Sequence, residues 1–199
     1  MKIALTGGIA CGKSTLAKFL TELGIRVLDA DDVVHELEGP GGEAVAQIAA
    51  RFGRDIVTQD GAIDRARLAS IVFFDPAARR DLEGILFPLV RARLLSFASE
   101  RSGEIRVAII PLLFESHWEA DYDIIAAIAS PRHVQVERMM RTRGYARAEA
   151  EARLAAQMPV AEKVARADYA VVNDSTPENL EAEARRLVSW LKERTKNEH

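Results

Sequence analysis

Short apolar runs alternate along the chain with longer stretches in which apolar residues recur every three or four positions. The run at 105–110 is almost continuously apolar, which is typical of a strand in the middle of a parallel sheet. We expect five strands, at residues 2–6, 25–28, 105–110, 124–129 and 169–172. Strands that alternate with helices predict an α/β fold of three layers, α/β/α, around a five-stranded parallel sheet.

Helical periodicity fills the intervals, and glycine and proline mark its ends. From residue 62 to residue 102 no strand pattern occurs, so we expect a helical insertion, in which Pro88 kinks a helix or starts a new one. Met158 and Pro159 should end a helix at 146–157. The other expected helices cover residues 16–23, 33–37, 44–52, 132–143 and the segment after Thr176-Pro177.

The segment between the first strand and the first helix fits the phosphate-loop pattern G-x-x-x-x-G-K-[ST]. Glycines let the backbone wrap around a phosphate chain, and the helix N-terminus adds partial positive charge. A lysine at this place reaches the outer phosphates, and the next hydroxyl binds Mg²⁺. An ordinary glycine turn is the alternative, but strand, loop and helix occur in the required order. The predicted ATP-binding residues are Gly7, Gly8, Ala10, Cys11, Gly12, Lys13, Ser14 and Thr15, with Ser14 as the metal ligand.

The composition of the chain limits its expected partners and cellular location. The net charge is −3 over 199 residues, so no basic field indicates nucleic acid or an anionic membrane as a partner. No apolar run approaches a membrane span, and the chain enters a strand too early for a signal peptide, so we expect a cytoplasmic protein. Cys11 is the single cysteine; we interpret it as a small loop residue rather than a redox sensor. Nothing indicates an obligate protein partner.

Two further absences restrict the type of nucleotide-binding protein. The chain has no N-K-x-D motif for reading guanine, and its third strand ends in Pro111 rather than in the aspartate of motor ATPases. A small-molecule kinase remains. Such an enzyme needs a group that orients or deprotonates the acceptor hydroxyl, and Asp29, Asp31 and Asp32 are the candidates. The same residues also suit the N-terminal cap of the next helix.

Basic residues after the fourth strand indicate a lid. Arg138, Arg141 and Arg143 lie on one predicted helix, where a mobile lid could neutralise charge on the transferring phosphoryl group. A solvated basic face is the alternative. The histidines His35, His117 and His133 are scattered, without the spacing of metal ligands.

Several motifs together resemble the dephospho-coenzyme A kinase family over essentially the whole chain. They are Leu5–Ile9 with Gly12–Thr15, Asp29–Asp31, Asp60–Arg65, Val72-Phe73, Asp75-Pro76, Leu82–Ile85, Pro111–Glu115, Gln135, Arg138, Gln157, Lys163, Ala167–Tyr169 and Asn173. The phosphate loop alone is generic, whereas the aspartate pair and the P-L-L-x-E segment are specific to this family.

The resemblance implies that ATP, with Mg²⁺, phosphorylates the ribose 3′-hydroxyl of dephospho-CoA in the last step of coenzyme A synthesis. It singles out Asp31 as base, and Lys13 and Arg138 as stabilisers of the transferring phosphoryl group. Asn173 would join the nucleotide site. The implied substrate-binding residues are Asp31, His35, Arg65, Pro111, Leu112, Leu113 and Glu115.

The resemblance also implies a division of the chain. The core would comprise residues 1–61, 103–137 and 154–199, with a CoA-binding insertion at 62–102 and a lid at 138–153. Rival hypotheses are a nucleoside or nucleoside-monophosphate kinase on the same fold, and an ATP-binding regulator without transferase activity.

The sequence departs from the family pattern at four places. Ala10 replaces the usual glycine, which is tolerable on condition that the backbone there has a negative φ. Phe87 stands where histidine is common, Thr142 where a second lid arginine is usual, and Val172 where an acid is usual. None of them alters Lys13 or Asp31.

Overall fold

A five-stranded sheet is the centre of the computed structural model, which describes residues 1–100 and 103–196. The strands are β1 (Ile3–Gly7), β2 (Arg26–Asp29), β3 (Arg106–Ile109), β4 (Ile124–Ala129) and β5 (Tyr169–Val172), in the order β2-β3-β1-β4-β5. The middle strand β1 runs parallel to β3 and β4, with Leu5 opposite Ile109 and Ala126. The predicted five strands and their parallel sheet are therefore confirmed, with ends that differ by one residue in β1, β2 and β3.

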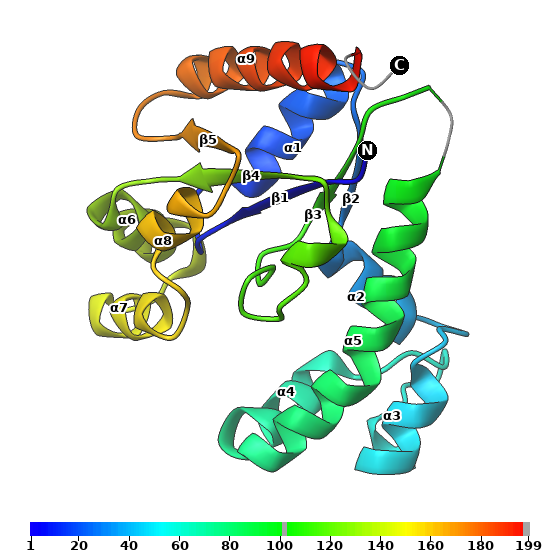
Figure 1. The fold of residues 1–199 in the computed structure, drawn as a ribbon. Helices are drawn as coiled ribbons and strands as arrows, with labels where there is room; N and C mark the ends of the chain where they lie inside the picture. Colours follow the sequence, from blue (N-terminus) through cyan, green and yellow to red (C-terminus); the bar gives the residue numbers. More distant parts are fainter. Residues whose placement is uncertain (101–102, 197–199) are drawn as a thin grey trace. The chain divides into compact units, whose positions relative to one another are not determined.

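Helices cover both faces of this sheet (Figure 1). On one face α1 and α9 lie side by side, and on the other face α8 packs against β1 and β4. Side chains of β1, β3, β4, α1 and α9 form a common buried core. The helices are α1 (Lys13–Glu22), α2 (Ala30–Glu38), α3 (Val45–Phe52), α4 (Arg65–Phe74), α5 (Pro76–Ser99), α6 (Arg132–Arg143), α7 (Arg147–Ala155), α8 (Val160–Ala165) and α9 (Pro177–Lys196).

Two helical predictions need correction. Pro88 does not start a new helix, because it lies inside the continuous helix α5, and the alternative that it kinks this helix stays a prediction. The helix expected at 146–157 ends at Ala155, and a further helix, α8, follows Pro159. Helix α8 has only six residues, too few for hydrophobic periodicity to reveal it.

The chain forms two compact units. The first comprises Met1–Leu28 and the chain from Phe97 onward, and the second comprises Asp29–Ser96. The second unit therefore includes α2 and α3, in addition to helices of the expected insertion at 62–102. The last two residues of that insertion lie outside the described residues. That this insertion binds substrate stays a prediction.

The strand ends determine where polar residues collect in the first unit. Parallel strands direct their carboxyl ends to one edge of a sheet, where ligands bind in open α/β folds. Gly7 ends β1, Ser130 follows β4 and Asn173 follows β5, while Pro111 lies just beyond β3. In the part of the chain that the structure describes, no helix has the length and apolar character of a membrane span.

Candidate functional site: a phosphate loop and its supports

Close packing behind the phosphate loop requires its glycines. Gly12 has φ 94°, and a Cβ on it would lie 2.2 Å from Asn173 Nδ2. A Cβ on Gly7 would lie 2.5 Å from the carbonyl oxygen of Ile128. Both distances are too short for any other residue, so the loop backbone lies directly against β4 and the residue after β5.

Ala10 adopts φ 57°, which is the left-handed conformation. The condition of a negative φ is therefore not met, and Ala10 occupies backbone geometry that favours glycine. A left-handed L-residue costs about 1–2 kcal/mol. Such strain persists only where the surrounding structure fixes the backbone, so the contacts of the neighbouring residues explain how Ala10 is accommodated.

Two glutamines fix the backbone just before Ala10. Gln135 Nε2 donates a hydrogen bond to Ile9 O over 2.7 Å, and Ile9 N donates to Gln157 Oε1 over 3.2 Å. Gln135 is buried on α6, whereas Gln157 lies in the connection between α7 and α8. Both polar groups of the Ile9 backbone are thus paired with side chains from distant parts of the chain.

The carbonyl groups after Ile9 are held by a second set of side chains. Arg138 Nη1 donates to Ala10 O over 3.2 Å, and Asn173 Nδ2 donates to Cys11 O over 2.8 Å. Arg138 Nη2 also donates to Asn173 Oδ1 over 3.1 Å, and Arg138 Nη1 donates to Ser130 Oγ over 3.0 Å. Three consecutive carbonyls, at residues 9–11, are therefore bound by protein donors.

This arrangement gives Arg138 and Asn173 definite places. Arg138, expected on a lid, lies on α6 with its guanidinium bound to the loop backbone. Asn173 is 6% exposed, and its amide is used by Cys11 and Arg138. Arg141 and Arg143, in contrast, are exposed in the last turn of α6. The sequence motif thus contains one loop-bound and two solvent-facing arginines.

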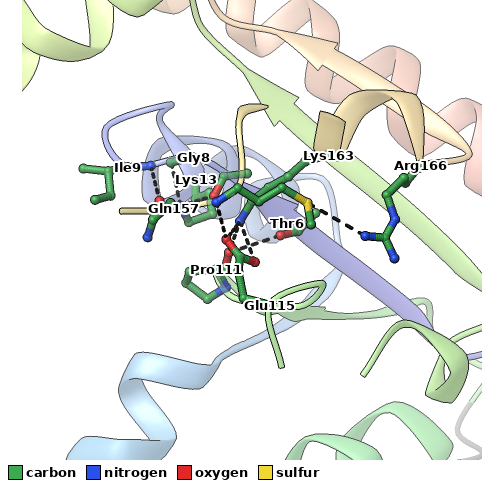
Figure 2. Close-up of polar contacts among 11 residues, drawn as sticks. Thr6, Gly8, Ile9, Lys13, Pro111, Glu115, Gln157, Lys163 and Arg166 are labelled. Atoms are coloured by element: carbon green, nitrogen blue, oxygen red, sulfur yellow. Dashed lines mark hydrogen bonds and ion pairs between the residues drawn. The ribbon is translucent and has the colours of Figure 1, made fainter. Parts of the chain in front are cut away.

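Lys13 and Ser14 begin α1 directly after the loop. Lys13 Nζ donates to Gly7 O over 3.0 Å and to Gly8 O over 2.9 Å (Figure 2). Ser14 and Thr15 are exposed in the first helical turn. A serine hydroxyl in this position suits Mg²⁺, which takes few protein oxygens and completes its shell with phosphates and water. No group of three or more His, Cys, Asp or Glu side chains suited to a metal occurs within residues 1–100 and 103–196.

Cys11 is buried in the loop and receives a hydrogen bond from Gln135 Nε2 at 3.1 Å. Burial raises the pKa of its thiol above the ordinary value, against the opposing positive charges of Lys13 and Arg138. A buried thiol with a raised pKa is a poor nucleophile. The structure therefore agrees with the interpretation of Cys11 as a small loop residue.

The segment that follows β3, the strand next to β1 in the sheet, contributes the carboxylate of Glu115. Glu115 is 23% exposed and forms an ion pair with Lys163, and Lys163 Nζ also donates to Pro111 O over 2.7 Å (Figure 2). Leu112 is partly exposed, whereas Leu113 is fully buried and offers no side-chain surface to a ligand. Beside Gly8 lies a cavity of about 180 Å³, lined by Gly8, Arg132, Gln135, Leu154, Gln157, Met158, Pro159, Val160 and Ala161.

The second unit brings together three of the predicted substrate residues. Asp29 caps α2 by accepting a hydrogen bond from Asp31 N at 3.0 Å. His35 Nδ1 lies 2.7 Å from Asp31 O, and His35 Nε2 contacts Arg65 Nη1. Within the described residues, the exposed carboxylate of Asp31 makes no hydrogen bond.

Glu38 completes this cluster from the buried side of α2. Its Oε2 lies 2.9 Å from Arg65 Nε as an ion pair, although the angle is not that of a hydrogen bond. Burial raises the pKa of Glu38, with the charges of Arg65 and His35 opposing it. Arg65 is therefore held by His35 and Glu38 at once.

Sequence reasoning missed Ser130, and it assigned no role to Gln135, Gln157 or Lys163. Ser130 could have been found from its position, because it follows a parallel strand directly, as Asn173 does. The contacts of the other three depend on tertiary packing between segments that are distant in sequence. The spacing of residues along the chain does not reveal such contacts.

Comparison with known proteins agrees with this geometry. The dephospho-CoA kinase family model matches residues 1–179. A dephospho-CoA kinase of Anaeromyxobacter dehalogenans is 45% identical over 193 residues, which cover 96% of this chain and 92% of that protein. The solved dephospho-CoA kinase of Campylobacter jejuni has a TM-score of 0.69 at 25% identity, covering 94% of this chain and 95% of the other.

A more distant structure extends the fold beyond this family. Shikimate kinase of Acinetobacter baumannii has a TM-score of 0.53 at 16% identity, over 96% of this chain and 93% of the other, so the likeness concerns the fold alone. The family match covers most of the chain and includes the phosphate loop with all its supports up to Asn173. The chain belongs to the dephospho-CoA kinase family.

Proposed function

We propose that this protein transfers the γ-phosphoryl group of ATP to the ribose 3′-hydroxyl of dephospho-CoA, giving coenzyme A. The observation that carries the proposal is the phosphate loop, whose carbonyls at residues 9–11 are all bound by side chains behind it. A loop fixed in this way is prepared for phosphate before the ligand arrives, which lowers the cost of ordering on binding. Family membership supplies the acceptor.

Positive side chains at the phosphate loop stabilise the phosphoryl group as it is transferred. Lys13 begins α1, and its ammonium stabilises charge that develops on the phosphoryl oxygens. Arg138 lies within hydrogen-bond distance of Ala10 O, so its guanidinium adds a second positive charge beside the loop. Preorganised charges of this kind act without reorganisation during the reaction.

Asp31 accepts the proton of the acceptor hydroxyl in this proposal. Its carboxylate is exposed and makes no hydrogen bond to the described residues, and α2 is capped by the neighbouring Asp29 instead. The two roles that the sequence left open are therefore divided between two aspartates. His35 and Arg65, in the same unit as Asp31, bind the substrate in this proposal. The two side chains contact each other, and His35 also contacts the backbone carbonyl of Asp31.

A divalent cation fits the first turn of α1. The exposed Ser14 hydroxyl is an oxygen donor of the kind that Mg²⁺ prefers, and it would hold the metal together with the phosphates. A metal held there would supply positive charge that offsets the negative charge of the phosphates.

The test is ADP release with Mg-ATP and a panel of acceptors: dephospho-CoA, AMP, CMP, adenosine and none. Release that depends on dephospho-CoA alone is the expected result. Release with AMP, CMP or adenosine would replace the substrate and support the nucleoside or nucleotide kinase hypothesis. Tight ATP binding without release in any arm would instead support the regulator hypothesis.

A further inference from the structure

Lys163 is a buried cation without a role in the proposed reaction. Its side chain is 0% exposed, on the six-residue helix α8. Burial of an ammonium group is unfavourable unless every donor is paired. The Nζ donates to Pro111 O at 2.7 Å and to Glu115 Oε2 at 3.0 Å, and Glu115 Oε1 lies 2.8 Å away (Figure 2). The ammonium group therefore makes two hydrogen bonds and one further close ion-pair contact, all with the segment after β3.

The partner of Lys163 connects two segments. Glu115 Oε1 also accepts a hydrogen bond from Met158 N at 3.1 Å, in the connection between α7 and α8. Pro111 O accepts a second bond from the buried Thr6 Oγ1 at 3.4 Å. The pair therefore joins the segment after β3 to α8 and to the α7–α8 connection, while Thr6 joins the same segment to β1.

The α7–α8 connection also forms part of the cavity beside Gly8. Gln157, Met158 and Pro159 line that cavity, and Val160 and Ala161 continue its wall into α8. The Lys163–Glu115 pair thus determines the position of one cavity wall, although Lys163 itself does not line the cavity.

The phosphate loop is held mainly by other residues. Its carbonyls at residues 9–11 are bound by Gln135, Arg138 and Asn173, on α6 and after β5. The bond from Ile9 N to Gln157 Oε1 joins the loop to the α7–α8 connection. Loss of the Lys163 pair should therefore disturb the segment after β3 more than it disturbs the nucleotide site.

Stability alone is a weak explanation for this pair. Replacing a buried ion pair by apolar residues of similar volume is often neutral or stabilising, because desolvation offsets the attraction. The Glu115 carboxylate also remains partly exposed, and of its about four lone-pair positions two accept hydrogen bonds, from Lys163 and from Met158 N. The carboxylate therefore keeps the capacity to accept a hydrogen bond from a ligand.

We propose that Lys163 is a positioning residue for the acceptor substrate: it fixes Glu115 and the adjoining cavity wall in the geometry that binds dephospho-CoA. This inference rests on the proposed function for the identity of the acceptor. Lys163 acts through Glu115 and does not touch the substrate. A positioning error of about 1 Å can reduce activity by about 10²-fold.

The test is a double-mutant cycle with Lys163→Met, Glu115→Gln and the double variant. The dissociation constant of dephospho-CoA is measured by titration calorimetry, and the KM of ATP and the thermal midpoint are measured alongside. We expect each single variant to weaken dephospho-CoA binding by about 10–100-fold. The double variant should be no weaker than either single variant, because both changes disrupt one unit. The KM of ATP should stay within about 2-fold, since the loop carbonyls keep their own donors.

Stability effects are separated by two further variants. Glu115→Leu combined with Lys163→Met removes the pair without leaving an unpaired charge, so its midpoint should return toward that of the wild type while acceptor binding stays weak. Arg185→Met removes a cation from the exposed pair with Glu181 and should change neither property. If Lys163→Met alone fails to fold, Glu115→Gln and the two double variants complete the comparison.

Three results would overturn the proposal. They are additive effects in the cycle, an equal rise in the KM of ATP, and recovery of acceptor binding together with stability in the apolar double variant. Failure of the proposed function looks different, because wild-type protein would then neither bind nor phosphorylate dephospho-CoA.

Discussion

At the scale of single residues, Ala10 shows how the fold maintains an unfavourable backbone conformation. Ala10 has φ 57°, and its carbonyl accepts a hydrogen bond from Arg138. The preceding residue, Ile9, is bound by two glutamines. The sequence revealed the departure from glycine, but it could not reveal the sign of φ. That sign follows from contacts with side chains over 120 residues away along the chain.

Ala10→Gly should raise the stability of the protein. Glycine removes left-handed strain of about 1–2 kcal/mol but loses about 0.5–1 kcal/mol through its greater freedom in the unfolded chain. We expect the free energy of unfolding, measured by urea denaturation, to rise by about 0.5–1 kcal/mol. Ala182→Gly, inside α9, is the matched control and should lower it by about 1 kcal/mol. A loss of similar size at Ala10 would contradict the presence of backbone strain at this residue.

Asn173→Ala should weaken nucleotide binding without affecting the acceptor. The variant removes one hydrogen bond from Cys11 O and one from the Arg138 guanidinium, at about 0.5–3 kcal/mol for each lost bond, although Ser130 still bonds to both groups. We expect the KM of ATP to rise by at least about 10-fold. Asn179→Ala, which removes an exposed asparagine bonded to Ser175, is the control. An unchanged KM of ATP would mean that the loop keeps its shape without this support.

At the scale of elements, long periodic segments were predictable and short ones were not. The segments at 124–129 and 169–172 coincide with β4 and β5, and the helix expected at 132–143 is α6. Helix α8 escaped prediction because its six residues are positioned by Lys163 and by packing against the sheet. Pro88 lies within α5 because tertiary packing can override a local helix breaker.

Helix α2 carries a pH-dependent contribution to stability at Glu38. Burial raises the pKa of this group, so the folded protein binds its proton more tightly than the unfolded chain does. Its stability contribution is complete below the ordinary value of 4.5 and is lost as the pH rises through the raised value. The unfolding free energy of wild type minus that of Glu38→Gln should therefore fall as pH increases through this window.

Urea denaturation at several pH values provides this comparison. Glu36→Gln, on the exposed side of α2, controls for loss of a carboxylate from the same helix. A difference for Glu38→Gln that grows with increasing pH would reverse the sign and show that the Arg65 ion pair outweighs burial.

At the scale of the whole molecule, the predicted residues belong to two compact units. Lys13, Arg138 and Asn173 belong to the first, and Asp31, His35 and Arg65 belong to the second. Sequence identified members of both sets, because phosphate loops and strand-end carboxylates have recognisable spacing. It could not identify the supporting contacts, because these join residues that are distant in sequence and have no spacing rule.

Asp31→Asn tests the proposal that the second unit supplies the base while the phosphate loop of the first unit binds ATP. The change keeps the size of the side chain but removes the base, so kcat should fall by about 10²–10⁴-fold. The KM of ATP should be preserved, because the loop and its supports are untouched. Asp32→Asn, the adjacent exposed acid, is the control. Equal losses in both variants would mean that general negative charge, and not the position of Asp31, matters.

The most direct measurement is phosphorus NMR of the products formed from Mg-ATP and dephospho-CoA, with Lys13→Ala as the inactive control. We expect the ATP γ-phosphate resonance to disappear while one new phosphomonoester resonance appears, assigned to the ribose 3′ position. Lys13→Ala should form no such product. Inorganic phosphate as the only product, or a phosphomonoester at another position, would contradict the proposed phosphoryl transfer.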